Sequence, residues 1–336
     1  MNRTLAKTMA VVPSCSSLDC VARQGWSRRA VIAALACALS CIVPALTHAQ
    51  QVIRISTIPI LPTVPVKYGI EKQWFKNQGL NVELAMTAGA RVAMQAVMTG
   101  DIQLAFGSFD AAVALKSKGA DIVIVSGNNR ARMLPPDGGA VVVRADSGIK
   151  RLRDLAGKTI LVNSLYNVNW IYTREAILKD RGSLASVKFR EMEFPHMLSA
   201  LSAQQADAAS TTEPFTSLSK NGGFQIISYI YVDVQPGLNV AGWTARGDWV
   251  RNNRDAVLRF KSVLQKLFEH LRQHPDELRQ AILRHTQLTE KTLYEMAIDE
   301  FATEISIADL QKQIDLALKH GAIDASVDAR ALVFRD

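Results

Sequence analysis

Beyond residue 49 the chain contains no cysteine. All four cysteines precede residue 50: Cys15, Cys20, Cys37 and Cys41. The rest of the chain therefore has no disulfide, no thiolate metal site and no cysteine nucleophile. The sequence also lacks a Gly-x-Ser-x-Gly elbow, a Walker A loop and the dinucleotide glycine fingerprint. These absences remove the common sequence signatures of catalysis and indicate a function other than an enzyme's.

A large excess of one charge is missing as well. The formal net charge is +8 over 336 residues, and half of it lies within residues 1–49. No basic run is interleaved with aromatic side chains, so nucleic acid is not an expected partner. Hydrophobic residues make up 48% of the chain, which is enough for one large core or two moderate ones.

The apolar run Ala30–Leu46 carries no charge, but it is shorter than the roughly 20 residues that span a membrane. It follows Ser27-Arg28-Arg29 and precedes Thr47-His48-Ala49, which places small residues suited to signal cleavage. This pattern predicts that residues 1–49 are an export signal cleaved near Ala49 and that the mature protein lies in the periplasm. The paired arginines fit both a twin-arginine signal and an ordinary secretion signal, and an uncleaved anchor remains an alternative.

Strands and helices alternate along the remainder of the chain. The pattern predicts strands over 52–58, 80–86, 104–106 and 122–126, with helices over 66–78, 90–98 and 111–118. It restarts with strands over 159–162, 187–194, 206–209 and 225–230, and ends with a strand over 238–245 and helices over 249–321. Pro59, Pro62 and Pro65 predict an irregular loop between the first strand and the first helix. The alternation predicts an α/β fold with mainly parallel sheets flanked by helices.

Because the pattern restarts, we expect two lobes. Residues 50–143 and 238–336 form lobe 1 in this prediction, and residues 144–237 form lobe 2. The chain then crosses between the lobes twice, and paired crossings of this kind can act as a hinge that closes on a ligand.

Several segments, in this order, resemble those of one known family: Gly79–Glu83, Gly100–Ala105, Gly138-Gly139, Leu152–Ile160 and Asp207–Phe215. The sequence resembles the substrate-binding proteins of ABC importers for nitrate, sulfonates, taurine, bicarbonate and thiamine precursors (NitT/TauT-like). The resemblance implies a two-lobed periplasmic-binding-protein fold of the type II kind, with a ligand at the lobe interface. It also implies a monomer that works with a membrane permease and an ATPase, without catalysis.

Polar residues at the carboxyl ends of strands are the candidates for ligand contact, since helix starts there offer free N–H groups to an anion. Residues of the proline-rich loop add an apolar wall. The predicted ligand-binding residues are Thr63, Val64, Ser108, Asn128, Asn163, Ser164, Tyr166, Asn167, Thr211 and Glu213. Ser108 can also serve only as a helix cap, and Glu213 can also be structural. We expect Asp110, in a first helical turn, to complement its own helix dipole.

The loop Thr57–Pro65 is rich in proline and aliphatic side chains, and it offers little to a small inorganic anion. We therefore expect an organic, anionic ligand rather than nitrate, with or without an aromatic ring. His270 and His274 have a spacing that suits a metal, but Pro275 follows at once, so we expect a solvated helix face, no metal site and no cofactor. Two alternatives remain: an exported binding protein that serves a sensor, and a lyase or isomerase on the same fold.

Overall fold

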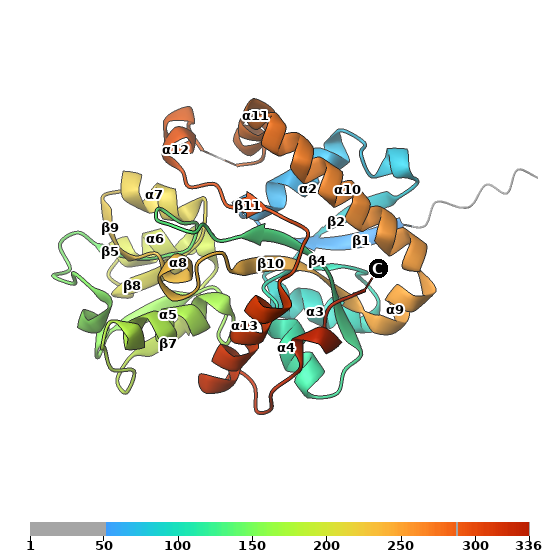
Figure 1. Cartoon of the computed structure of the whole chain (residues 1–336). Coiled ribbons are helices and arrows are strands. Elements are labelled where there is room, and N and C mark those ends of the chain that lie inside the picture. Colours follow the sequence, from blue (N-terminus) through green and yellow to red (C-terminus); the bar gives the residue numbers. More distant parts are fainter. Residues whose placement is uncertain (1–51, 287, 336) are drawn as a thin grey trace, which may run out of the picture. The chain divides into compact units, whose positions relative to one another are not determined.

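The strands fall into two main groups in the structure, a computed structural model that describes residues 52–286 and 288–335 (Figure 1). The predicted export signal lies outside the described residues. Within the described residues no helix combines the length and the apolar character that a membrane crossing needs.

The first group of strands comes from both ends of the described chain. Strands β11 (Glu300–Phe301), β4 (Ile122–Arg130), β10 (Asn239–Arg246) and β3 (Ala105–Gly107) form one sheet in that order. Strands β1 (Val52–Thr57) and β2 (Asn81–Met86) pair in parallel, and a bridge between Ile55 and Leu104 connects β1 to the β3 edge. Strands β1 to β4 run in one direction, and β10 runs against β3 and β4.

The second group is a five-stranded sheet from the middle of the chain. Its order is β7 (Lys188–Glu191), β6 (Thr159–Val162), β8 (Ala208–Thr211), β5 (Ala140–Arg144) and β9 (Phe224–Ser228). Strand β6 is parallel to β7 and β8, whereas β5 is antiparallel to β8 and β9. In both groups most strands share one direction, but the antiparallel β5, β10 and β11 make the sheets mixed, so the prediction of mainly parallel sheets is wrong while that of an α/β fold is confirmed.

Helices follow the strands as the sequence pattern requires, and Figure 1 shows α5 to α8 around the five-stranded sheet. The helices before β10 are α2 (Val64–Glu71), α3 (Ala90–Thr99), α4 (Asp110–Ser117), α5 (Val168–Lys179), α6 (Phe194–Ser202), α7 (Phe215–Asn221) and α8 (Ile230–Val234). Those after it are α9 (Gly247–Asn252), α10 (Arg254–Gln273), α11 (Pro275–His285), α12 (Glu290–Glu295) and α13 (Ile307–Lys319). Short 3₁₀ turns occupy Leu61–Thr63, Lys76–Gln78, Leu152–Leu155 and Ala329–Ala331.

The prediction of an irregular proline-rich loop is wrong at its C-terminal end. A 3₁₀ turn begins at Leu61, and α2 begins at Val64 with Pro65 in its first turn. Proline is tolerated there because its fixed φ suits a helix and the first N–H groups have no helical partner. The same helix ends at Glu71, earlier than expected, and Gln73 then takes a positive φ of 61°.

The chain passes between the two groups of strands at two places. It leaves β4 at Arg130 and enters β5 at Ala140, and it returns between Val234 and Asn239. The predicted lobe boundary at residue 143 therefore falls inside β5, which pairs with β8 and β9. Both large buried clusters contain side chains from both groups of strands, for example Leu161 with Trp243 in one and Ile124 with Ile160 in the other.

The C-terminal helices divide between the two groups. Helix α10 buries the apolar positions expected from its spacing, which include Phe260, Leu264 and Leu267, and it contacts α2. A side chain of this kind contributes roughly 1.5–3 kcal/mol when fully buried. Helix α12 contacts α7, and α13 contacts both α4 and α5. The sequence had led us to expect that the C-terminal helices cover the first group alone, and this prediction is wrong.

Candidate functional site

A cavity of about 680 Å³ lies between α3, α4 and the start of α5. Its size suits a small organic molecule. Much of its wall is apolar, with contributions from Ile58, Ile60, Met94, Phe106, Phe194 and Val240. Residues of both groups of strands and their loops line it, so a molecule inside would touch both.

Five of the predicted ligand-binding residues line this cavity, and they come from two loops. Ser108 follows β3 and immediately precedes α4, while Asn163, Ser164, Tyr166 and Asn167 connect β6 to α5. The structure therefore brings together the two strand–loop–helix starts that the sequence indicated for ligand contact.

The loop between β6 and α5 is held by its own side chains. Asn167 caps α5: its Oδ1 accepts a hydrogen bond from the Trp170 N–H at 3.1 Å, and its Nδ2 donates to Asn163 Oδ1 at 2.8 Å. Tyr166 has a positive φ of 64°, and its ring lies 4.9 Å from that of Trp170. The asparagines thus shape the loop, while Tyr166 stays about half exposed at the cavity.

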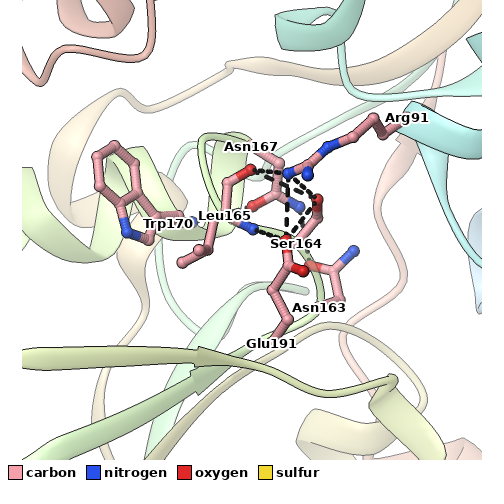
Figure 2. Close-up of polar contacts among 7 residues, drawn as sticks. All are labelled: Arg91, Asn163, Ser164, Leu165, Asn167, Trp170 and Glu191. Atoms are coloured by element: carbon pink, nitrogen blue, oxygen red, sulfur yellow. Dashed lines mark hydrogen bonds and ion pairs between the residues drawn. The ribbon is translucent and has the colours of Figure 1, made fainter.

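Arg91, in the first turn of α3, reaches across to this loop (Figure 2). Its Nη2 donates to Ser164 Oγ at 3.1 Å and to the Leu165 carbonyl at 2.8 Å, and it pairs with Glu191 Oε1 at 3.1 Å. Glu191, at the end of β7, also accepts from the Leu165 N–H at 2.7 Å. Arg91 lines the cavity and connects the first group of strands to the second.

Asp110 opens α4, lines the cavity and is buried. Its Oδ2 has no hydrogen-bond partner among the described residues. Burial raises the pKa of Asp110 to about 6, although hydrogen bonds from the Ser108 hydroxyl and from the N–H groups of Asp110 and Val168 oppose the rise. The carboxylate thus sits at the starts of α4 and α5 together.

The proline-rich loop and the end of β4 contribute other residues than those predicted. Thr63 is buried, and its Oγ1 donates to the carbonyls of Ile58 and Ile60 at 3.0 and 2.9 Å. Val64 is buried in the core. Asn128 is buried as well: it donates to the Pro62 carbonyl at 2.9 Å and accepts from Trp243 Nε1 at 3.1 Å. None of the three lines the cavity, whereas their neighbours Pro62 and Asn129 do.

Thr211 and Glu213 also lie outside the cavity lining, and only Thr212 between them reaches it. Thr211 Oγ1 bonds to the Ala140 carbonyl at 3.3 Å. The Glu213 carboxyl accepts from the N–H and the Oγ of Ser217 at 3.1 and 2.9 Å. Burial raises its pKa to about 8, so Glu213 is mainly protonated at neutral pH. These contacts hold the Glu213 carboxyl within the protein and away from the cavity lining.

Nothing in the sequence pointed to Arg91 or Glu191 as residues of this site. An arginine near a helix start and a glutamate at a strand end are ordinary surface residues, and both side chains remain about half exposed here. The sequence analysis named Asp110, but its position in a first helical turn indicated only an interaction with its own helix dipole. Only the approach of α5 makes it part of a cavity.

Three side chains elsewhere could supply ligands to a metal ion. His270, His274 and Glu277 bring potential ligand atoms within 4.8 Å of one another. His270 Nε2 lies 3.3 Å from Glu277 Oε2, the two imidazole rings stack with centroids 4.1 Å apart, and the Tyr68 hydroxyl donates to Glu277. The predicted solvated helix face is therefore also a connected polar cluster at the junction of α10 and α11.

Comparisons with known proteins agree with this architecture. Residues 63–278 match the NMT1/THI5-like family, and the chain belongs to it. No curated protein sequence matches the chain.

Solved structures of binding proteins share the fold. The zinc-bound ligand-binding component of an ABC-type import system from Staphylococcus aureus is 18% identical, with a TM-score of 0.72 over 84% of this chain and 96% of its own. The alkanesulfonate-binding protein SsuA of Xanthomonas axonopodis pv. citri, bound to MOPS, is 16% identical, with a TM-score of 0.71 over 85% and 98%. The periplasmic nitrate-binding protein NrtA of Synechocystis PCC 6803 is 13% identical, with a TM-score of 0.67 over 84% and 86%. The predicted periplasmic-binding-protein fold is thereby confirmed.

Proposed function

We propose that this chain is the periplasmic solute-binding protein of an ABC importer. It captures a small organic molecule and delivers it to a membrane permease that is driven by an ATPase. It acts as a monomer, without a cofactor and without catalysis, after removal of residues 1–49. Its family and the import-system binding proteins that share its fold support this proposal.

The observation that carries the proposal is that loops from both groups of strands build the wall of one cavity. Ser108 comes from the β3–α4 loop and Ser164 from the β6–α5 loop, and both line one cavity. A ligand that touches both loops stabilises the arrangement in which they face each other, so it shifts the population towards a closed form. The two groups of strands are the moving parts in this proposal, and the chain joins them between Arg130 and Ala140 and between Val234 and Asn239.

Arg91 links the two sides of the cavity in that closed arrangement. Its contacts with Ser164, Leu165 and Glu191 join α3 to the opposite loop beside the cavity. The groups are about half exposed, so the ion pair contributes roughly 0–1 kcal/mol. A contact of this size can assist closure but leaves ligand binding as the main source of stabilisation.

Filling the cavity tests the proposal directly. Ala111 lines the cavity from α4 and is partly exposed. The Ala111→Phe variant should fold and should no longer be stabilised by compounds that raise the melting temperature of the unmodified protein in a screen of organic acids, amines and heterocycles. Ala185→Phe, at an exposed position outside the cavity lining, is the matched control.

Two results would contradict the proposal. Unchanged ligand binding by Ala111→Phe would show that the cavity is not the binding site. Chemical conversion of a bound ligand by the purified protein would favour the lyase or isomerase alternative.

A further inference from the structure

The starts of α4 and α5 face the same cavity, and helix starts of this kind ordinarily attract anions. The sequence led us to expect contact between such helix starts and an anion. In the structure, however, a carboxylate of the protein already lies there. Asp110 is the first residue of α4, and the Val168 N–H, in the first turn of α5, acts on the same carboxylate. The positive ends of both helices are therefore partly neutralised from within.

Asp110 retains an acceptor that the protein does not satisfy. Oδ2 is buried and without a partner among the described residues, and Asn129 Oδ1, on a second residue of the cavity wall, is in the same state. A buried acceptor without a donor costs about 1–3 kcal/mol, and more when it is charged. A ligand with N–H groups would remove this cost.

The cations of the cavity wall do not offset the carboxylate. Arg91 is held by Glu191 and by the Leu165 carbonyl, and Lys118 is exposed at the end of α4. A second anion placed against Asp110 would meet a like charge in a wall that is largely apolar. The surroundings of Asp110 therefore favour a donor over an acceptor.

On the basis of the function proposed above, we propose that the ligand presents a cationic nitrogen group rich in N–H donors, an amine or an amidine, to Asp110. The apolar body of the ligand then packs against Met94, Phe106 and Phe194, which line the same cavity. Asp110 is a specificity-determining residue in this assignment, and the loop that carries Ser108 positions it.

Matched probes of opposite charge test the assignment on the unmodified protein. Benzamidine and benzylamine present N–H donors, benzoate and benzenesulfonate present acceptors on the same ring, and benzamide is the neutral reference. We expect the two cations to raise the melting temperature and the two anions to have no effect. Isothermal titration then gives the dissociation constant for benzamidine.

The Asp110→Asn variant keeps the shape of the side chain and removes its charge. It should weaken benzamidine binding by roughly 30-fold or more, since a buried charged pair is lost. Asp276→Asn, whose side chain is 92% exposed, should leave the dissociation constant unchanged.

The outcomes separate this inference from the proposed function. Stabilisation by the anions and not by the cations would overturn the role of Asp110 and leave a solute-binding protein. Equal binding of benzamidine by Asp110→Asn and the unmodified protein would also overturn it. If no probe of either charge binds, the inference is wrong, and the Ala111→Phe screen decides separately whether the cavity binds ligands. The probe comparison needs no variant, so it holds even if Asp110→Asn fails to fold.

Discussion

Two segments of the chain share a design but face different surroundings. In residues 105–117, β3 ends in Gly107-Ser108 and α4 begins with Asp110; in residues 208–221, β8 ends in Thr211-Thr212-Glu213 and α7 follows. Each carries a buried carboxyl close to a helix start with a serine beside it: Asp110 with Ser108, and Glu213 with Ser217. Asp110 lines the cavity, whereas Glu213 does not.

The difference lies in how the carboxyl groups are satisfied. Glu213 receives two hydrogen bonds from Ser217, and its backbone carbonyl accepts from the Leu61 N–H at 3.1 Å. Asp110 keeps one oxygen without a partner. Burial raises the pKa of Glu213 to about 8 but that of Asp110 only to about 6. At neutral pH the first is thus mainly a neutral structural group, and the second is mainly a charge that faces a cavity. A local sequence pattern alone does not distinguish these roles.

The largest effect that would test this contrast concerns stability against pH. The pKa of Glu213 is about 8 in the folded protein against its ordinary value of 4.5, so the folded state holds a proton that the unfolded state releases. Stability from this group is complete below the unfolded value and is lost as pH rises towards about 8, by on the order of 1 kcal/mol per pH unit. Glu213→Gln cannot titrate, so its stability relative to the unmodified protein should rise between pH 5 and pH 8.

Urea unfolding at several pH values measures this difference. Glu83→Gln, with a side chain that is 52% exposed, is the control and should show no such trend. A stability difference between Glu213→Gln and the unmodified protein that stays constant over this pH range would contradict a buried neutral carboxyl at Glu213.

A smaller effect is expected from the hydroxyl groups of the two cavity loops. Ser108→Ala removes the hydroxyl beside Asp110, and Ser164→Ala removes a partner of Arg91. Each hydrogen bond to a charged group contributes about 1.5–3 kcal/mol, so each variant should weaken binding of a ligand found in the screen by roughly tenfold. Thr216→Ser, near Thr211 and outside the cavity lining, should not. If both alanine variants bind as tightly as the unmodified protein, the helix starts are not the binding site.

The smallest effect should come from loss of the ion pair between Arg91 and Glu191. Arg91→Gln breaks the ion pair with Glu191. Because that pair is about half exposed, the free energy of unfolding should fall by no more than about 1 kcal/mol. Ligand affinity should fall severalfold, since the pair joins the two sides of the cavity. Arg153→Gln breaks a similar pair with Asp180 away from the cavity lining. The Arg153→Gln variant should leave ligand affinity unchanged. Equal losses of affinity in the two variants would show that the Arg91–Glu191 pair does not link the two sides of the cavity.

Local patterns predicted much of the fold. Alternating apolar residues in β1 and the helical spacing of Phe260, Leu264 and Leu267 identify the buried face of an element without reference to any other. Local reasoning did less well with the prolines of the first loop, because a proline in a first helical turn and a proline in an irregular loop have the same local signature.

The candidate site was predicted in part. Ser108, Asn163, Ser164, Tyr166 and Asn167 line the cavity, whereas Thr63, Val64, Asn128, Thr211 and Glu213 do not. All ten lie near strand ends or helix starts. The sequence could therefore predict these positions, but not which of their side chains point into the cavity. A shift of one residue turns a side chain to the other face of a strand, as Asn128 and Asn129 in β4 show, since only Asn129 lines the cavity.

By itself, the sequence determined the order of strands and helices and the two loops where polar groups gather at helix starts. Only the tertiary structure decided that Arg91 meets Glu191, that α5 approaches Asp110, and that Glu213 lies outside the cavity lining. The physical reason is range: periodicity and capping act within a few residues, whereas Arg91 and Glu191 are 100 positions apart. Their contact exists only because the two groups of strands face each other across one cavity.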